Sequence, residues 1–161
     1  LEHYVNTDEN YWTSSEDSIR LINLWAVECP PCAAETPYLA KVHEEFKSEP
    51  GFKFLSVCMT DAFSSDRPAS PDDVKQFLWR AGEEELPVYR DSQSGIYNAI
   101  VQFGNDEPMR LQPEHQSLPI PVTILVDRDD VICEMWVGFD PVEGDLIADE
   151  MMRRISNELT R

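Results

Sequence analysis

The chain has 161 residues and a formal net charge of −18, with 31 acidic residues against 13 basic ones. Its size suits one well-buried core, and a hydrophobic content of 42% excludes a disordered composition. Because nucleic acids and anionic lipids attract clustered Lys and Arg, the charge argues against both partners, and no stretch approaches the roughly 18 apolar residues needed for direct membrane insertion.

The first half of the chain predicts a strand, a helix, a second strand and a second helix. Residues 1–18 are polar and acidic and predict an arm or an edge hairpin. The apolar run 19–27 predicts a central strand covered on both faces. A helical pattern follows over 30–50, and residues 52–59 predict the second strand. The second helix is expected over 70–82, because this stretch opens with a capping Ser, an early Pro and two Asp.

The second half predicts a hairpin followed by a closing helix. We expect a short strand at 86–89, a short helix at 96–101 and an irregular loop at 102–118, which contains Met109 and His115. The third strand is expected at 121–126 and the fourth, antiparallel to it, at 131–137. An amphipathic helix over 143–159 has an apolar stripe that consists of Leu146, Ile147, Met151, Ile155 and Leu159. The order of elements indicates an α/β protein with a mixed sheet.

A Cys29-Pro30-Pro31-Cys32 motif lies where the first strand gives way to the first helix. Helix N-termini present unpaired N–H groups and about half a positive charge, which favours a thiolate. The pKa of Cys29 should therefore lie below the roughly 8.5 of a free cysteine. Cys32 follows one turn later, close enough to attack a mixed disulfide formed on Cys29.

A zinc site is the structural alternative for a C-x-x-C pair. Zinc takes four ligands, and the second half of such a site is usually another C-x-x-C or a pair of histidines. Here His3, His43 and His115 are scattered and none is paired with a cysteine. The sequence therefore favours redox chemistry, with no metal and no other cofactor.

Two stretches resemble the thioredoxin superfamily, and most closely its extracytoplasmic TlpA/ResA-type branch, which includes the thiol reductases of cytochrome c maturation. Residues 21–37 read LINLWAVECPPCAAETP, which matches the Trp25-Ala26 pair, the C-P-P-C motif and the following Glu35 and Pro37. Residues 120–127 read IPVTILVD and are similar to the family's cis-proline strand. The resemblance implies a thioredoxin-like domain over 19–161, with a central mixed sheet flanked by helices on both faces.

The resemblance also implies roles for individual residues. Cys29 would be the nucleophile and Cys32 the resolving thiol, joined in a redox disulfide. Pro121 would be cis and packed against the dithiol, although the residues alone also allow a trans proline at a strand start. The backbone of Ile120 would offer an edge to an extended substrate segment, and we place Pro121, Trp25 and Glu28 in the same substrate-binding surface.

Glu35 and Glu28 are two carboxylates close to the dithiol. Thioredoxins proper keep a buried acid six residues before the first cysteine, where this chain has Asn23, which cannot take a proton. Glu35 shares a helix face with Cys32 and is the candidate general acid/base; the alternative is a surface carboxylate. Glu28 stands where the family usually has Trp, and we expect it to raise the pKa of Cys29.

The remaining cysteines, Cys58 and Cys133, are expected to be small buried side chains. A second disulfide is the alternative, but the two strands that carry them should not be neighbours. The leading interpretation is a monomeric, extracytoplasmic thiol–disulfide oxidoreductase whose targeting segment is absent from this chain; a cytoplasmic address stays open. It would reduce disulfides of protein partners and receive electrons from an upstream thiol donor. A net oxidant or isomerase, and a non-catalytic binding module with an acidic surface, remain alternatives.

Overall fold

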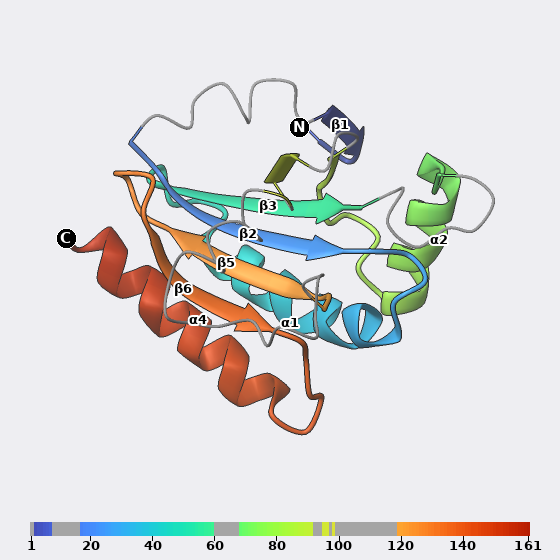
Figure 1. Cartoon of the computed structure of the whole chain (residues 1–161). Helices are drawn as coiled ribbons and strands as arrows, with labels where there is room; N and C mark the ends of the chain where they lie inside the picture. Colours follow the sequence, from blue (N-terminus) through green and yellow to red (C-terminus); the bar gives the residue numbers. More distant parts are fainter. Residues whose placement is uncertain (1, 8–16, 60–67, 92–94, 97, 99–118) are drawn as a thin grey trace.

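The computed structural model describes residues 2–7, 17–59, 68–91, 95, 96, 98 and 119–161. Its centre is one six-stranded sheet with the order β1-β4-β3-β2-β5-β6. The strands are β1 (Glu2–Val5), β2 (Ile19–Trp25), β3 (Phe52–Cys58), β4 (Val88–Arg90), β5 (Val122–Val126) and β6 (Ile132–Val137). The strands β2, β3 and β4 run parallel, whereas β1, β5 and β6 pair antiparallel to their neighbours, so the sheet is mixed (Figure 1).

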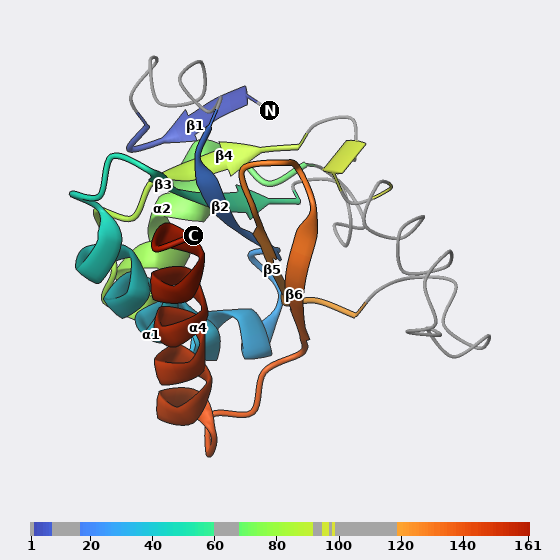
Figure 2. The same ribbon diagram turned by 90° about the vertical axis from the view of Figure 1, so that its left-hand side faces the viewer.

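Three long helices cover one face of this sheet. They are α1 (Pro30–Phe46), α2 (Pro71–Ala81) and α4 (Gly144–Leu159), and they lie together on the same side of the strands (Figure 2). Their buried side chains, such as Val42, Leu78 and Met151, form a single apolar cluster with Phe54 of β3. None of the described helices is both long and apolar enough to cross a lipid bilayer.

The opposite face of the sheet has its own apolar cluster. Side chains that alternate with those of the first face, among them Ile22, Leu55 and Ile124, gather here. Residues 95, 96 and 98 are helical, and Ile96 packs against this cluster. Helical residues therefore approach the sheet from both faces, as a thioredoxin-like fold requires. The predicted loop 102–118, with Met109 and His115, lies outside the described residues.

The ends of α2 confirm the signals predicted for them. The Ser70 hydroxyl oxygen accepts a hydrogen bond from the Asp73 backbone N–H at 3.3 Å, and the Asp73 carboxylate accepts one from the Ser70 N–H at 2.8 Å. Gly82 ends the helix with φ 76° in the left-handed region, which glycine adopts without a steric penalty.

Two boundaries differ from the predictions. The short strand predicted at 86–89 is β4, which begins at Val88 because the Leu86 N–H donates to the Glu83 carbonyl in the preceding turn. In α4 the predicted stripe included Leu146, which is wrong, since this side chain is 72% exposed. The buried residue on that turn is Ala148, two positions later and therefore about 200° around the helix.

Cys58 and Cys133, the two cysteines outside the C-P-P-C motif, are free thiols. Cys58 of β3 is fully buried, and burial raises its pKa to about 12. Cys133 is only half-buried, less than predicted, because β6 is the edge strand of the sheet. The strands β2 and β5 separate the two cysteines, which confirms that they do not bridge each other.

The first described residues belong to the sheet. β1 pairs antiparallel with β4 and forms the edge of the sheet opposite to β6. Its partner strand is more than eighty residues away in sequence. The division into an arm at 1–18 and a domain at 19–161 stays a prediction.

Candidate active site

Cys29 and Cys32 lie between the end of β2 and the first turn of α1. They are joined by a disulfide, with 5.2 Å between their Cα atoms. Cys29 is the N-cap residue of α1, and its Sγ accepts a hydrogen bond from the Cys32 backbone N–H at 3.2 Å. Because Pro30 and Pro31 occupy the first two helical positions and lack N–H groups, Cys32 contributes the first N–H of the helix. A sulfur thus takes the place that Ser, Thr or Asp oxygen usually holds at an N-cap.

The two sulfurs differ in accessibility. Cys29 is half-buried, whereas Cys32 is only 1% exposed. A partner molecule can therefore reach Cys29, while Cys32 is accessible to Cys29 alone. The two sulfurs therefore differ in what can attack them; the nucleophile and resolving roles that the resemblance implies stay a prediction.

The segment before β5 lies directly against this disulfide. The peptide bond between Ile120 and Pro121 is cis, as the resemblance implied. The carbonyl oxygen of Ile120 lies 3.7 Å from Cys29 Sγ. Pro121 is buried and its carbonyl accepts a hydrogen bond from Gly138 N–H at 2.8 Å, which ties this segment to the end of β6.

Glu35 is buried beneath the dithiol and is not a surface carboxylate. Its side chain is 2% exposed. Asn23 of β2 donates from Nδ2 to Glu35 Oε2 at 3.0 Å, and the Thr123 hydroxyl of β5 donates to Glu35 Oε1 at 3.2 Å. Cys32 lies one helical turn before Glu35 on α1, and both side chains are buried.

Burial changes the protonation of Glu35. The loss of solvent raises its pKa from the ordinary 4.5 to about 7, while the hydrogen bonds from Thr123 and Asn23 act in the opposite direction. A carboxyl group with this pKa exchanges protons readily near neutral pH, which is the property needed in a general acid/base. The sequence identified Glu35 but missed both partners. The available signal was one uncharged polar residue, Asn23 or Thr123, within each of two otherwise largely apolar strands.

Trp25 and Glu28 lie in different environments. Trp25 is 3% exposed, stacks on Phe77 at 4.4 Å between ring centroids, and donates from Nε1 to Ser56 Oγ at 2.8 Å. Its ring belongs to the same buried apolar cluster as Cys32, and its place in the substrate-binding surface stays a prediction. Glu28 is exposed beside Cys29, on the accessible side of the site.

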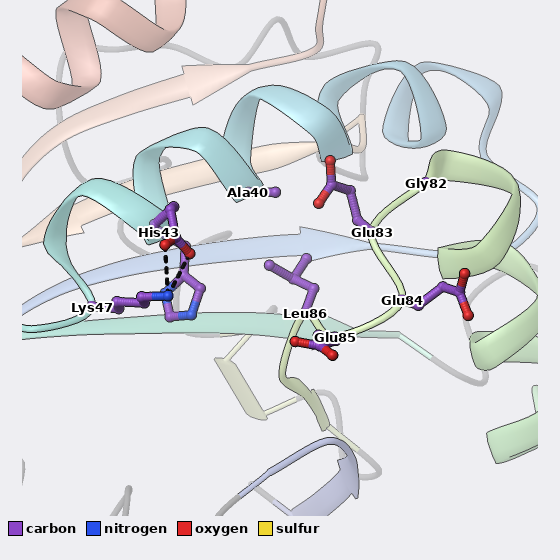
Figure 3. A pocket seen from close by; sticks show the side chains of 9 residues that line it. Ala40, His43, Lys47, Gly82, Glu83, Glu84, Glu85 and Leu86 are labelled. Carbon is purple, nitrogen blue, oxygen red and sulfur yellow. Dashed lines mark hydrogen bonds and ion pairs between the residues drawn. The ribbon is translucent and has the colours of Figure 1, made fainter.

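A separate hollow of about 550 Å³ lies at the other end of α1. Figure 3 shows that it is bounded by α1 on one side and by the segment after α2 on the other. Its lining consists of Ala40, His43, Glu44, Lys47, Gly82, Glu83, Glu84, Glu85 and Leu86. It contains neither cysteine and is not part of the dithiol site. Among the residues that the structure describes, no group of three or more His, Cys, Asp or Glu side chains is arranged to hold a metal ion.

The mixed sheet, the disulfide at the start of α1 and the neighbouring cis-proline together define a thioredoxin-like protein with a redox-active disulfide. The Redoxin family pattern matches residues 3–150. The chain belongs to the Redoxin family.

Individual relatives agree with this assignment. Thiol-disulfide oxidoreductase ResA of Halalkalibacterium halodurans is 26% identical over 118 residues, which are 73% of this chain and 52% of the relative, so the chain spans about half of that protein's length. A thiol:disulfide interchange protein from Chlorobium tepidum superposes with a TM-score of 0.61 and 19% identity, covering 91% of this chain and 83% of that one.

A secreted disulfide oxidoreductase of Mycobacterium tuberculosis, described as homologous to E. coli DsbE, has the same fold. It superposes with a TM-score of 0.55 and 15% identity, covering 90% of this chain and 85% of that one. The family match and the Cys29–Cys32 disulfide are consistent with each other, and the solved structures share the fold.

Proposed function

We propose that this protein is a thiol–disulfide oxidoreductase that reduces disulfides of protein partners through Cys29. The observation that carries the proposal is the environment of Cys29: its half-buried sulfur caps α1, accepts the Cys32 N–H, and is bonded to a sulfur that no partner can reach. A thiolate at this position would be stabilised by the same N–H group and by the helix dipole.

The proposed reaction has two exchanges. The Cys29 thiolate attacks one sulfur of the partner's disulfide, and the other partner sulfur leaves as a thiolate that takes a proton. Glu35 then accepts the proton of the Cys32 thiol, and the Cys32 thiolate attacks Cys29 Sγ. The partner's remaining sulfur leaves as a thiolate. Two electrons have passed to the partner, and the chain holds the Cys29–Cys32 disulfide, which an upstream thiol donor must reduce again.

The partner's extended segment would bind beside Cys29, along the backbone of Ile120 and Pro121. Ile120 lies outside β5 and next to the reactive sulfur, so its backbone can pair with a substrate strand. Exposed Glu28 would contact the same substrate. The reducing direction and an extracytoplasmic location follow the resemblance to the TlpA/ResA-type branch, and the secreted relative supports the location. A monomer is sufficient for this reaction, because every group it uses comes from one chain.

Cys32→Ala is expected to trap a partner on Cys29, because the variant can form the mixed disulfide but cannot resolve it. The reduced variant is mixed with a protein that carries an exposed disulfide, and the adduct is detected by mass spectrometry before and after addition of dithiothreitol. The Cys29→Ser/Cys32→Ala double variant is the matched control. We expect the adduct with the single variant only.

Two results would overturn the proposal. An adduct of equal yield on the double variant would show that Cys58 or Cys133 reacts instead. A lack of any adduct with the single variant would favour the non-catalytic binding module.

Equilibration of the wild-type Cys29–Cys32 pair with glutathione buffers measures its reduction potential. This potential separates a reductase from a net oxidant, since about 30 mV corresponds to 1.4 kcal/mol for a two-electron couple.

A further inference from the structure

Three buried polar side chains from three different elements form a closed hydrogen-bonded triangle beneath the dithiol. Asn23 of β2 and Thr123 of β5 are direct partners in the antiparallel ladder, so both side chains leave the sheet on the α1 side. Asn23 Nδ2 also donates to Thr123 Oγ1 at 2.9 Å, and Glu35 of α1 closes the triangle. All three side chains are at most 2% exposed.

Every hydrogen-bond donor in this triangle is used in a bond to another member of the triangle. Both N–H bonds of the Asn23 amide are used, one on Glu35 Oε2 and one on Thr123 Oγ1. Because Thr123 Oγ1 accepts from Asn23, its own proton is directed at Glu35 Oε1. Each carboxylate oxygen therefore faces a donor, and the arrangement fits the ionised form of Glu35.

Protonation of Glu35 affects the two partners differently. An amide N–H cannot accept a proton, so the lone pair of Oε2 that faces Asn23 is blocked. A hydroxyl group can either donate or accept. Thr123 is therefore the partner that can reverse its hydrogen bond when Oε1 takes a proton, and Asn23 is the partner that keeps the carboxyl in place.

No charged group is among the causes that shift the pKa of Glu35. The causes that act on its pKa are burial and the two hydrogen bonds alone. Along its own helix the nearest titratable groups are Cys32 and Tyr38, each three residues away, while β2 and β5 contribute the neutral Asn23 and Thr123. Within the described residues, Glu35 has no salt-bridge partner.

We propose that Asn23 and Thr123 are positioning residues that hold the Glu35 carboxyl in one orientation and support its ionised form for proton exchange with Cys32. The inference rests on the proposed function. It assigns a different role to each residue. Asn23 remains a hydrogen-bond donor, whereas the Thr123 hydroxyl changes from donor to acceptor when Glu35 Oε1 is protonated.

The test separates the two exchanges with dithiobis(nitrobenzoate) as the disulfide. The reduced protein releases one chromophore when Cys29 attacks and a second when Cys32 resolves the adduct, and stopped-flow absorbance gives the rate of each phase against pH. Thr123→Val keeps the shape but removes the hydroxyl. We expect it to raise the pH midpoint of the second phase by about one unit and to leave the first phase unchanged, because a buried hydrogen bond to a charged group is lost.

Three further variants make the result specific. Thr123→Ser restores the hydroxyl and should restore the wild-type midpoint. Asn23→Ala removes the other donor, should shift the midpoint in the same direction, and replaces Thr123→Val if that variant does not fold. Ile124→Val changes the next position of β5, whose side chain lies on the opposite face, and should leave both phases unchanged. Glu35→Gln lacks the proton acceptor and is the reference for complete loss of proton exchange with Cys32 in the second phase.

The Glu35 carboxyl is also titrated by carbon NMR in the oxidised chain, which needs no turnover. An upward shift of about one pH unit in Thr123→Val, accompanied by the same shift of the second phase, supports the proposal. An unchanged NMR titration overturns it. So does a shifted titration with an unchanged second phase, or a Thr123→Ser variant that behaves like Thr123→Val. Failure of the first phase would instead contradict the proposed function, while the NMR result still decides whether the triangle controls Glu35.

Discussion

Cys29→Ser is expected to lower disulfide turnover by about 10³-fold or more, because the hydroxyl cannot replace a thiolate as the attacking group. Cys32 remains in the variant but is 1% exposed and cannot substitute as the nucleophile. The measurement is the steady-state reduction of a disulfide-containing peptide with dithiothreitol as the electron source, corrected for the rate without protein.

Cys58→Ser and Cys133→Ser are the matched controls for this loss. Both are free thiols outside the disulfide. Turnover by the Cys133 variant should equal that of the wild type, whereas the Cys58 variant changes a fully buried position and is compared at equal folded concentration. If Cys29→Ser retained more than a small fraction of the rate, the reaction would not proceed through Cys29.

Glu35→Gln is expected to stabilise the oxidised protein above neutral pH and to leave it unchanged in acid. The pKa of Glu35 is about 7 in the folded chain against an ordinary 4.5, so between these values the folded state binds more protons than the unfolded state. The free energy of unfolding of the wild type therefore falls as pH rises from about 4.5 to about 7 and is constant above that range. At about 1.4 kcal/mol per unit, the penalty that glutamine removes approaches about 3 kcal/mol.

Urea denaturation of the wild type and the variant at a series of pH values measures this difference directly. Glu45→Gln makes the same chemical change at an exposed position of α1 and controls for the loss of one surface charge. The gap between wild type and Glu35→Gln should open across the interval between the two pKa values. Curves that stay parallel over this interval would show that Glu35 titrates alike in the folded and unfolded chain.

The sequence predicted the elements of the fold where local chemistry decides them. The capping box at Ser70, the apolar runs of β2 and β3, and the polar turn before β6 each report a local structure, and all four elements were found within two residues of their predicted positions. Errors arose where tertiary contacts decide. Leu146 is apolar but faces solvent because the smaller Ala148 packs against the core, and β1 pairs with a strand far along the chain.

The same distinction applies to the candidate active site. Motif spacing alone placed Cys29 and Cys32 at the start of a helix, and Glu35 one turn beyond Cys32. The contact between Cys29 and Ile120 joins residues 91 positions apart, and only the resemblance to a known family predicted it. The Asn23–Thr123 pair escaped prediction because it depends on the register between β2 and β5. The stacking of Trp25 on Phe77 also escaped prediction, because it joins residues from two separate elements.

In the reduced protein, the start of α1 is expected to hold the Cys29 sulfur as an anion. The direct measurement is the rate of Cys29 alkylation by iodoacetamide against pH in the reduced protein, followed by mass spectrometry of the peptide that contains Cys29. We expect a midpoint below the roughly 8.5 of a simple thiol, with Cys32 protected throughout. A midpoint at or above that value, or modification of Cys32 at the rate of Cys29, would contradict the account.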